Sequence, residues 1–132
     1  MMRHLLALSL AALIPASAVL AQDSVGAEIY MENCAGCHGE TAMGDGPLSA
    51  LISIEMPDLT VLSRRYGGNF PLADVVRKID GRVEMRGHGD PMPVFGAMLS
   101  GASAVIDTAE GDPIVTKAAV LAVADYLERL QR

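Results

Sequence analysis

The sequence predicts an all-α protein in which three to five helices are joined by long loops. Three observations indicate this class. Apolar residues recur at helical spacing in three stretches, glycine and proline gather in the segments between them, and no stretch clearly shows the alternating pattern of a strand. The chain has 132 residues, which is enough for one domain and leaves no length for a second.

The first helix is predicted over residues 24–33. Val25 and Ile29 recur on one face together with either Ala27 or Tyr30, at the three-to-four spacing of an apolar stripe. The helix leads directly into a cysteine-containing motif, so we expect it to hold that motif rigidly.

A second helix is predicted over residues 72–79. Pro71 precedes it and Gly81 follows it, as is typical of helix ends. Its apolar stripe consists of Leu72, Val75, Val76 and Ile79. The segments 39–60 and 86–93 are rich in glycine and proline and are expected to be loops.

The last helix has the strongest signals. Asp112 can cap it, Pro113 suits the first helical position, and the apolar spacing continues to about Leu130. Its buried face is expected to contain Val120, Val123, Ala124, Leu127 and Leu130. Residues 100–111 combine small and acidic side chains and are expected to form a surface loop, where a partner could be chosen.

The motif Cys34-Ala35-Gly36-Cys37-His38 is the attachment signal for a c-type haem. Thiols three positions apart lie on neighbouring edges of one helical turn and can both add to the vinyl groups of one porphyrin. The imidazole that follows projects at the iron as its proximal ligand. Zinc usually needs a second Cys/His pair, and these are the only two cysteines. A thioredoxin-like pair needs a βαβ setting, and a disulfide would close too small a loop to stabilise much.

Residues 1–21 have the form of a secretory leader. A short basic start is followed by an apolar run and by small residues, so cleavage is expected after Ala21, before Gln22. The run is too short to cross a bilayer, and no membrane anchor is expected after cleavage; an uncleaved anchor is the alternative. The mature domain would be residues 22–132, located in the periplasm, because bacteria attach haem to such motifs outside the cytoplasm.

The chain is acidic. It contains 16 acidic and 10 basic residues, and one of the basic residues, Arg3, lies in the leader, so the mature formal charge is about −7. Such a surface argues against nucleic acid or an anionic membrane as a partner. It favours a partner with a basic docking patch, and binding that weakens with salt. Simple solubility is the alternative explanation.

The second iron ligand decides the chemistry, because an iron with two strong-field ligands transfers electrons whereas an open iron binds gas or substrate. Met92 stands out among the candidates because a proline precedes it and another follows it, which fixes the backbone. Met98 lies in an apolar stretch and is expected in the core. His88 lies between two glycines and is expected on the surface. We therefore expect Met92 to be the second ligand.

The mature chain as a whole resembles a class I bacterial cytochrome c. The haem motif lies near its N-terminus and a Met-Pro loop follows about fifty residues later, which is the order found in that family. The other matching pieces are Gly26 and Tyr30, Gly44-Asp45-Gly46-Pro47-Leu48, Pro57-Asp58-Leu59-Thr60, Met92-Pro93-Val94-Phe95-Gly96 and Ala124-Asp125-Tyr126-Leu127. The resemblance implies the cytochrome c fold, in which helices and long loops wrap around one covalently bound haem.

The resemblance also implies a role for each matching residue. Cys34 and Cys37 would hold the porphyrin, and His38 and Met92 would be the axial ligands of the iron. The carbonyl of Pro47 would accept a hydrogen bond from the second nitrogen of the imidazole, which fixes its tautomer.

Two further features follow from the resemblance. Gly26 would let the first helix cross close to the last helix, with Tyr30 against Tyr126 and Leu127. Many relatives use a tryptophan to bind a haem propionate, and this chain has none. The residues that could replace it are Arg64, Arg65, Tyr66 and Arg82, with a solvated surface position as the alternative for each.

The expected function is one-electron transfer in the periplasm by a His/Met-ligated haem c, without enzymatic activity of its own. The expected partners are periplasmic redox proteins that dock transiently at the haem edge near Cys37. The alternative is a haem c subunit of a periplasmic oxidoreductase complex that accepts electrons from a catalytic subunit. A catalyst or gas sensor would need an open iron, and Met92 counts against it.

Overall fold

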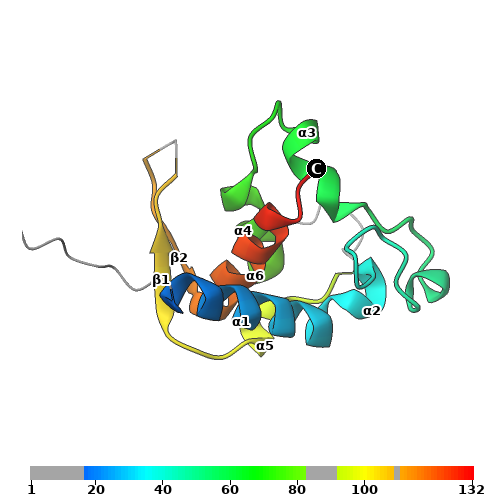
Figure 1. The fold of residues 1–132 in the computed structure, drawn as a ribbon, viewed down its shortest axis with the longest axis horizontal. Coiled ribbons are helices and arrows are strands. Elements are labelled where there is room, and N and C mark those ends of the chain that lie inside the picture. Colours follow the sequence, from blue (N-terminus) through cyan, green and yellow to red (C-terminus); the bar gives the residue numbers. More distant parts are fainter. Residues whose placement is uncertain (1–16, 83–91, 109–110) are drawn as a thin grey trace, which may run out of the picture.

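The computed structural model describes residues 17–82, 92–108 and 111–132, with side chains from Val25 onward (Figure 1). These residues form six α-helices, two 3₁₀ helices and two strands. In chain order they are α1 (Ser17–Asn33), α2 (Ala35–His38), η1 (Ser49–Leu51), η2 (Leu59–Val61), α3 (Leu62–Arg65), α4 (Leu72–Asp80), α5 (Phe95–Met98), β1 (Ser103–Ile106), β2 (Ile114–Lys117) and α6 (Ala118–Arg129).

All three predicted helices are present, as α1, α4 and α6. The remaining three α-helices are single turns of four residues each, so the described chain has more helices than the three to five predicted. α4 ends at Asp80 and is capped by Gly81, whose φ of 74° is left-handed and favours glycine. The buried face of α1 differs from the prediction, because Gly26 and Tyr30 are buried while Val25 is exposed.

The start of α1 bears on the predicted leader. α1 begins at Ser17, so a cleavage after Ala21 would fall within it. Residues 1–16 lie outside the described residues, and the leader and its cleavage stay predictions. Within the part of the chain that the structure describes, no helix is long and apolar enough to cross a membrane.

The prediction of an all-α chain is wrong at residues 103–117, where β1 and β2 form an antiparallel hairpin. The predicted helix start at Pro113 is also wrong, because α6 begins only at Ala118. The run from Ile114 to Thr116 is β-branched, and its side chains alternate between buried and exposed. Ile106 pairs with Ile114, and both are buried. The non-local pairing outweighs the local signals for a helix.

The core of the fold is the crossing of α1 over α6 (Figure 1). A Cβ atom added to Gly26 would collide with the carbonyl oxygen of Ala122, so only glycine permits this approach. The rings of Tyr30 and Tyr126 lie beside it, with centroids 5.4 Å apart and planes inclined at 49°. The crossing that the resemblance implied is therefore present.

The hydroxyl of Tyr30 connects this crossing to the segment after the motif. It donates a buried hydrogen bond of 2.7 Å to the carbonyl oxygen of Gly39. Burial raises the pKa of Tyr30 above its usual value, and the nearby Cys34 thiol adds to this shift. The phenol therefore stays protonated and remains a donor.

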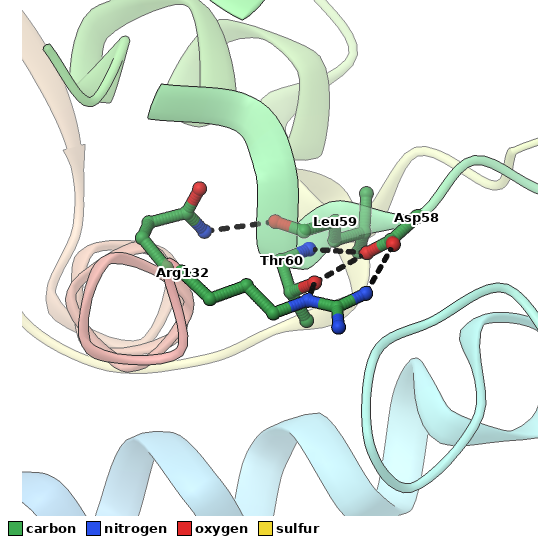
Figure 2. Close-up of polar contacts among 5 residues, drawn as sticks. Asp58, Leu59, Thr60 and Arg132 are labelled. Atoms are coloured by element: carbon green, nitrogen blue, oxygen red, sulfur yellow. Dashed lines mark hydrogen bonds and ion pairs between the residues drawn. The ribbon is translucent and has the colours of Figure 1, made fainter. Parts of the chain in front are cut away.

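The last two residues fold back over η2 (Figure 2). The guanidinium group of Arg132 donates to the hydroxyl of Thr60 at 2.8 Å and to the carboxylate of Asp58 at 3.0 Å. The side-chain amide of Gln131 donates to the carbonyl oxygen of Leu59 at 2.8 Å. These bonds fix the segment that forms one wall of the cavity described below.

Candidate functional site

The two thiols lie at the junction of α1 and α2. The amide of Cys34 donates to the carbonyl oxygen of Tyr30 at 2.8 Å, and the amide of Cys37 donates back to the carbonyl oxygen of Cys34 at 3.1 Å. α2 thus continues directly from α1, as expected. Both cysteines are free and partly buried. Burial raises the pKa of the Cys34 thiol to about 11, with a smaller contribution from Cys37.

The loop after the motif wraps closely around it. The amide of Gly44 donates to the carbonyl oxygen of His38, and the amide of Leu48 donates to that of Gly36, each at 2.8 Å. A Cβ atom on Gly46 would collide with the backbone of Cys37. The turn Gly44-Asp45-Gly46 is therefore needed because the loop must lie against the motif.

The motif opens into two adjoining cavities of about 350 Å³ and about 470 Å³. Both cysteines line the smaller cavity. The residues shared by the two cavities are His38, Pro57, Leu59, Lys78, Ile79, Met92 and Leu127. Most of the lining is apolar, as is typical of sites that hold a cofactor.

His38 is buried, and its environment favours the neutral imidazole. Burial lowers the pKa of His38 below its usual value, and the backbone carbonyl of Pro57 opposes this shift. The Nδ1 atom is buried without a hydrogen bond of normal geometry. A neutral imidazole is the form that binds a metal.

Two backbone carbonyls, those of Pro47 and Pro57, are candidates to accept a hydrogen bond from the imidazole of His38. Pro47, predicted for this role, is exposed and lines neither cavity. The carbonyl of Pro57 lies close enough to the imidazole to oppose the lowering of its pKa. The role of Pro47 stays a prediction, and Pro57 is a candidate that the sequence analysis missed.

Met92 is partly buried and lines both cavities together with His38. The structure thus brings the two predicted axial ligands to the same space. His88, the other candidate, lies outside the described residues. Met98 was expected in the core, but it is 66% exposed, because α5 is a single turn that buries only Phe95.

The cationic side chain that lies at the cavities differs from the candidates predicted to bind a haem propionate. Lys78 is the only lysine or arginine among the described residues that line either cavity. Tyr66 lines the larger cavity. Arg82 instead pairs with Asp80 at 3.2 Å and donates to the carbonyl oxygen of Val115. The remaining candidates, Arg64 and Arg65, are exposed and line neither cavity.

The residues around the cavities fit a covalently attached haem. Cys34 and Cys37 supply two thiols on one turn, His38 an imidazole and Met92 a thioether, all opening into the same space. The apolar walls suit the faces of a porphyrin, and Lys78 could neutralise one of its propionates. The donor set therefore matches haem c in number and type.

Comparison with known proteins agrees with this geometry. The family model described as cytochrome c matches residues 24–131, which include the motif, the walls of both cavities and α6. The chain matches no curated protein and no solved structure. The family match spans most of the sequence. The chain therefore belongs to the cytochrome c family, whose members bind haem c covalently and carry electrons.

Proposed function

We propose that this cytochrome c carries single electrons in the periplasm, with an iron held by His38 and Met92. The observation that supports this ligand pair is that both residues line both cavities, while the two thiols of the motif open into one of them. His38 and Met92 would hold the iron in both oxidation states, so little would reorganise when an electron is transferred, which favours fast exchange.

The protein would bind and orient its cofactor between the apolar walls of the two cavities. Haem c, when bound, supplies an iron that alternates between the ferric and ferrous states. Cys34 and Cys37 hold the macrocycle covalently, and buried His38 offers a neutral imidazole. The thioether of Met92 is a soft ligand that favours the ferrous state, and apolar walls raise the reduction potential further.

Two residues around the ligands have supporting roles in this proposal. The carbonyl of Pro57 would accept the Nδ1 proton of His38, which would leave Nε2 as the nitrogen available to an iron. Lys78 neutralises a haem propionate, because it is the only cationic side chain on the described cavity walls. Lys78 thus takes the place that the missing tryptophan has in many relatives.

Periplasmic location is supported by the leader-like residues 1–21 and by the covalent attachment of haem c, which the family shares. In this compartment the proposed partners are soluble redox proteins that donate and accept electrons in turn. Both proposed partners are proteins, and the cytochrome would pass electrons between them without converting a small-molecule substrate. The proposed role is therefore that of a carrier and not of a catalyst.

The alternative is a haem c subunit of a periplasmic oxidoreductase complex. The observation that favours it is a group of exposed apolar residues at 43–54, since permanent interfaces bury apolar surface. The size of the protein isolated from its native periplasm distinguishes the two functions. A carrier is recovered alone, whereas a subunit is recovered with a second chain in fixed ratio.

The optical spectrum of the mature holoprotein tests the ligand pair. We expect a low-spin ferric form with a methionine–iron charge-transfer band that is lost in Met92→Ala. Met98→Ala is the matched control, because Met98 is exposed and lines neither cavity, and it should keep the band. A high-spin wild type that binds carbon monoxide readily would contradict the proposal.

A further inference from the structure

Charge is distributed unevenly along the mature chain. Residues 22–63 contain seven acidic residues and neither lysine nor arginine, whereas residues 64–132 contain nine acidic and nine basic residues. The net charge therefore comes wholly from the part that contains the haem motif. We call residues 40–55 the acidic loop; its exposed carboxylates belong to Glu40, Asp45 and Glu55.

The acidic loop also exposes apolar side chains. Leu51 is 82% exposed, and Met43 is 45% exposed. Neither residue lines either cavity, so both belong to the outer surface. Leu48 and Ile54 are about half exposed and do line the smaller cavity. An apolar centre with a charged rim is the composition of a protein interface.

The position of the acidic loop suits electron exchange. Leu48 lies against Gly36, and the glycine turn before it lies against the backbone of Cys37. Cys37, Leu48 and Ile54 line the same cavity. In Figure 1 the loop lies at the same end of the molecule as α2, and the β-hairpin lies at the opposite end. A partner on the acidic loop would therefore be close to the cavity.

We propose that the acidic loop is the docking surface for a redox partner whose contact face is apolar at its centre and basic around it. This inference rests on the proposed electron-transfer function and names the surface and the partner's chemistry. On contact the reduced protein loses one electron and the partner's redox centre gains it, with no bond made or broken. The opposite charges of the acidic loop and its partner raise the association rate. The apolar contact area is small, so the complex dissociates readily.

The β-hairpin is the competing surface, and the composition of residues 100–111 had suggested it. Val105 and Val115 face each other in the register and are 61% and 53% exposed. Asp107 and Asp112 are exposed nearby. However, basic side chains also lie here, and Arg82 donates to the carbonyl of Val115, so this end lacks the uniform charge of the acidic loop.

Oxidation of the reduced holoprotein by tris(phenanthroline)cobalt(III) separates the two surfaces. This trication has apolar faces and accepts one electron to become cobalt(II). Two double variants are compared: Glu40→Lys with Glu55→Lys, and Asp107→Lys with Asp112→Lys. Both change the net charge by the same amount, but at opposite ends of the molecule. At low ionic strength we expect the first pair to slow oxidation about tenfold and the second pair to slow it less than about twofold. Added salt should remove the difference.

The apolar centre is tested separately. Leu51→Ser should slow oxidation by the same cobalt complex about threefold, because the apolar contact that Leu51 would make with the complex is lost. Val105→Ser is the matched control on the hairpin and should leave the rate unchanged. Equal effects of both serine variants would mean that Leu51 has no special part in docking.

A binding measurement that needs no electron transfer completes the test. Paramagnetic hexaamminechromium(III) should broaden the backbone amide signals of residues 40–55 in the NMR spectrum more than those of residues 103–117. The hexacyanochromate(III) anion is the control and should spare the acidic loop. Strongest broadening on the hairpin, or equal slowing by both pairs of lysine substitutions, would overturn the docking proposal.

The two proposals can fail independently. If neither the cobalt complex nor ferricyanide oxidises the reduced protein, electron transfer itself is contradicted. If both reagents oxidise it and the rate does not depend on which end carries the lysines, the carrier function stands and the acidic loop is not its docking surface.

Discussion

The α1–α6 crossing and the cavity walls are both apolar, but only the crossing is completed by the polypeptide alone. At the crossing, Gly26 brings the two backbones together, and Tyr30 and Val123 are almost fully buried. On the walls, Leu48 and Ile54 remain about half exposed. The comparison shows that one apolar region is packed by the chain itself, and the other is shaped for a cofactor.

The two regions are not independent, because α6 belongs to both. Val123 and Leu127 are buried in the core and also line the smaller cavity. Tyr30 lines the same cavity from α1. A change at the crossing is therefore expected to reach the cavity, and loss of the cofactor is expected to loosen the crossing.

Removal of haem should have the largest effect on stability. The double variant Cys34→Ser with Cys37→Ser should hold haem without covalent bonds, so that acid–butanone extraction removes it. Extraction leaves the apolar walls of both cavities without a partner, so the loss is expected to exceed the roughly 5 kcal/mol of the costliest single core truncation. Urea unfolding before and after extraction measures it. A difference below about 2 kcal/mol would mean that the walls pack without the cofactor.

Gly26→Ala should have the next largest effect, because the added Cβ meets the backbone of Ala122 and no side-chain rotation can relieve the collision. We expect a loss of about 3 kcal/mol in the free energy of unfolding, despite the higher helix propensity of alanine. Gly67→Ala is the control: no atom lies within 4 Å of its added Cβ, and only its φ of 70° opposes the change. Equal losses would show that the crossing is loosely packed.

The variant Tyr30→Phe tests how much the hydrogen bond from the crossing to the segment after the haem motif stabilises the fold. It keeps the ring contact with Tyr126 and removes the donor to the carbonyl of Gly39. We expect a loss of about 1–2 kcal/mol, because that buried acceptor is left without a partner. Tyr66→Phe, at an exposed position, should change stability much less. The measurement is urea unfolding of the holoproteins.

The smallest effect concerns Asp58, and it depends on pH. The hydroxyl of Thr60 lowers the pKa of Asp58, burial opposes this, and the amide of Thr60 and the guanidinium of Arg132 lower it further. A lowered pKa stabilises the folded state above the unfolded value of about 3.9, and this contribution is lost as the pH falls through the folded value. The difference in stability between wild type and Asp58→Asn should therefore shrink between about pH 5 and pH 3.

Thermal unfolding across this pH range checks the prediction. Arg132→Met removes only one of the groups that lower the pKa of Asp58, so its difference from wild type should change in the same direction and by less. A gap between wild type and Asp58→Asn that stays constant with pH would contradict the role of the carboxylate.

Much of the site could be predicted because its signals are local. The thiols and the imidazole lie within five consecutive residues, and the apolar spacing of α6 predicts four residues that are in fact buried: Val120, Val123, Ala124 and Leu127. Gly26 and Tyr30 were placed at the crossing by the resemblance to a family, since one sequence alone does not show which helices meet.

The errors arose where distant residues decide the structure. Asp112 and Pro113 are good signals for a helix start, but pairing with Ser103–Ile106 makes the following residues a strand. Lys78 and Pro57 reach the cavity only because α4 and the segment before η2 fold onto the motif. Nothing in the immediate neighbours of Lys78 marks it as part of a site, and the segment that contains Pro57 matches the family without assigning Pro57 a role.

The order of synthesis gives the crossing a further consequence. The residues that close the cavity from α6, Val123 and Leu127, are among the last to be made, and α1 must wait for them across nearly the whole chain. Closing so long a loop is a late and entropically costly step in folding. Until it occurs, the α6 side of the cavity that Cys34 and Cys37 line is not formed. The topology thus gives the newly made chain a period in which its thiols stay accessible for attachment, before the fold encloses them.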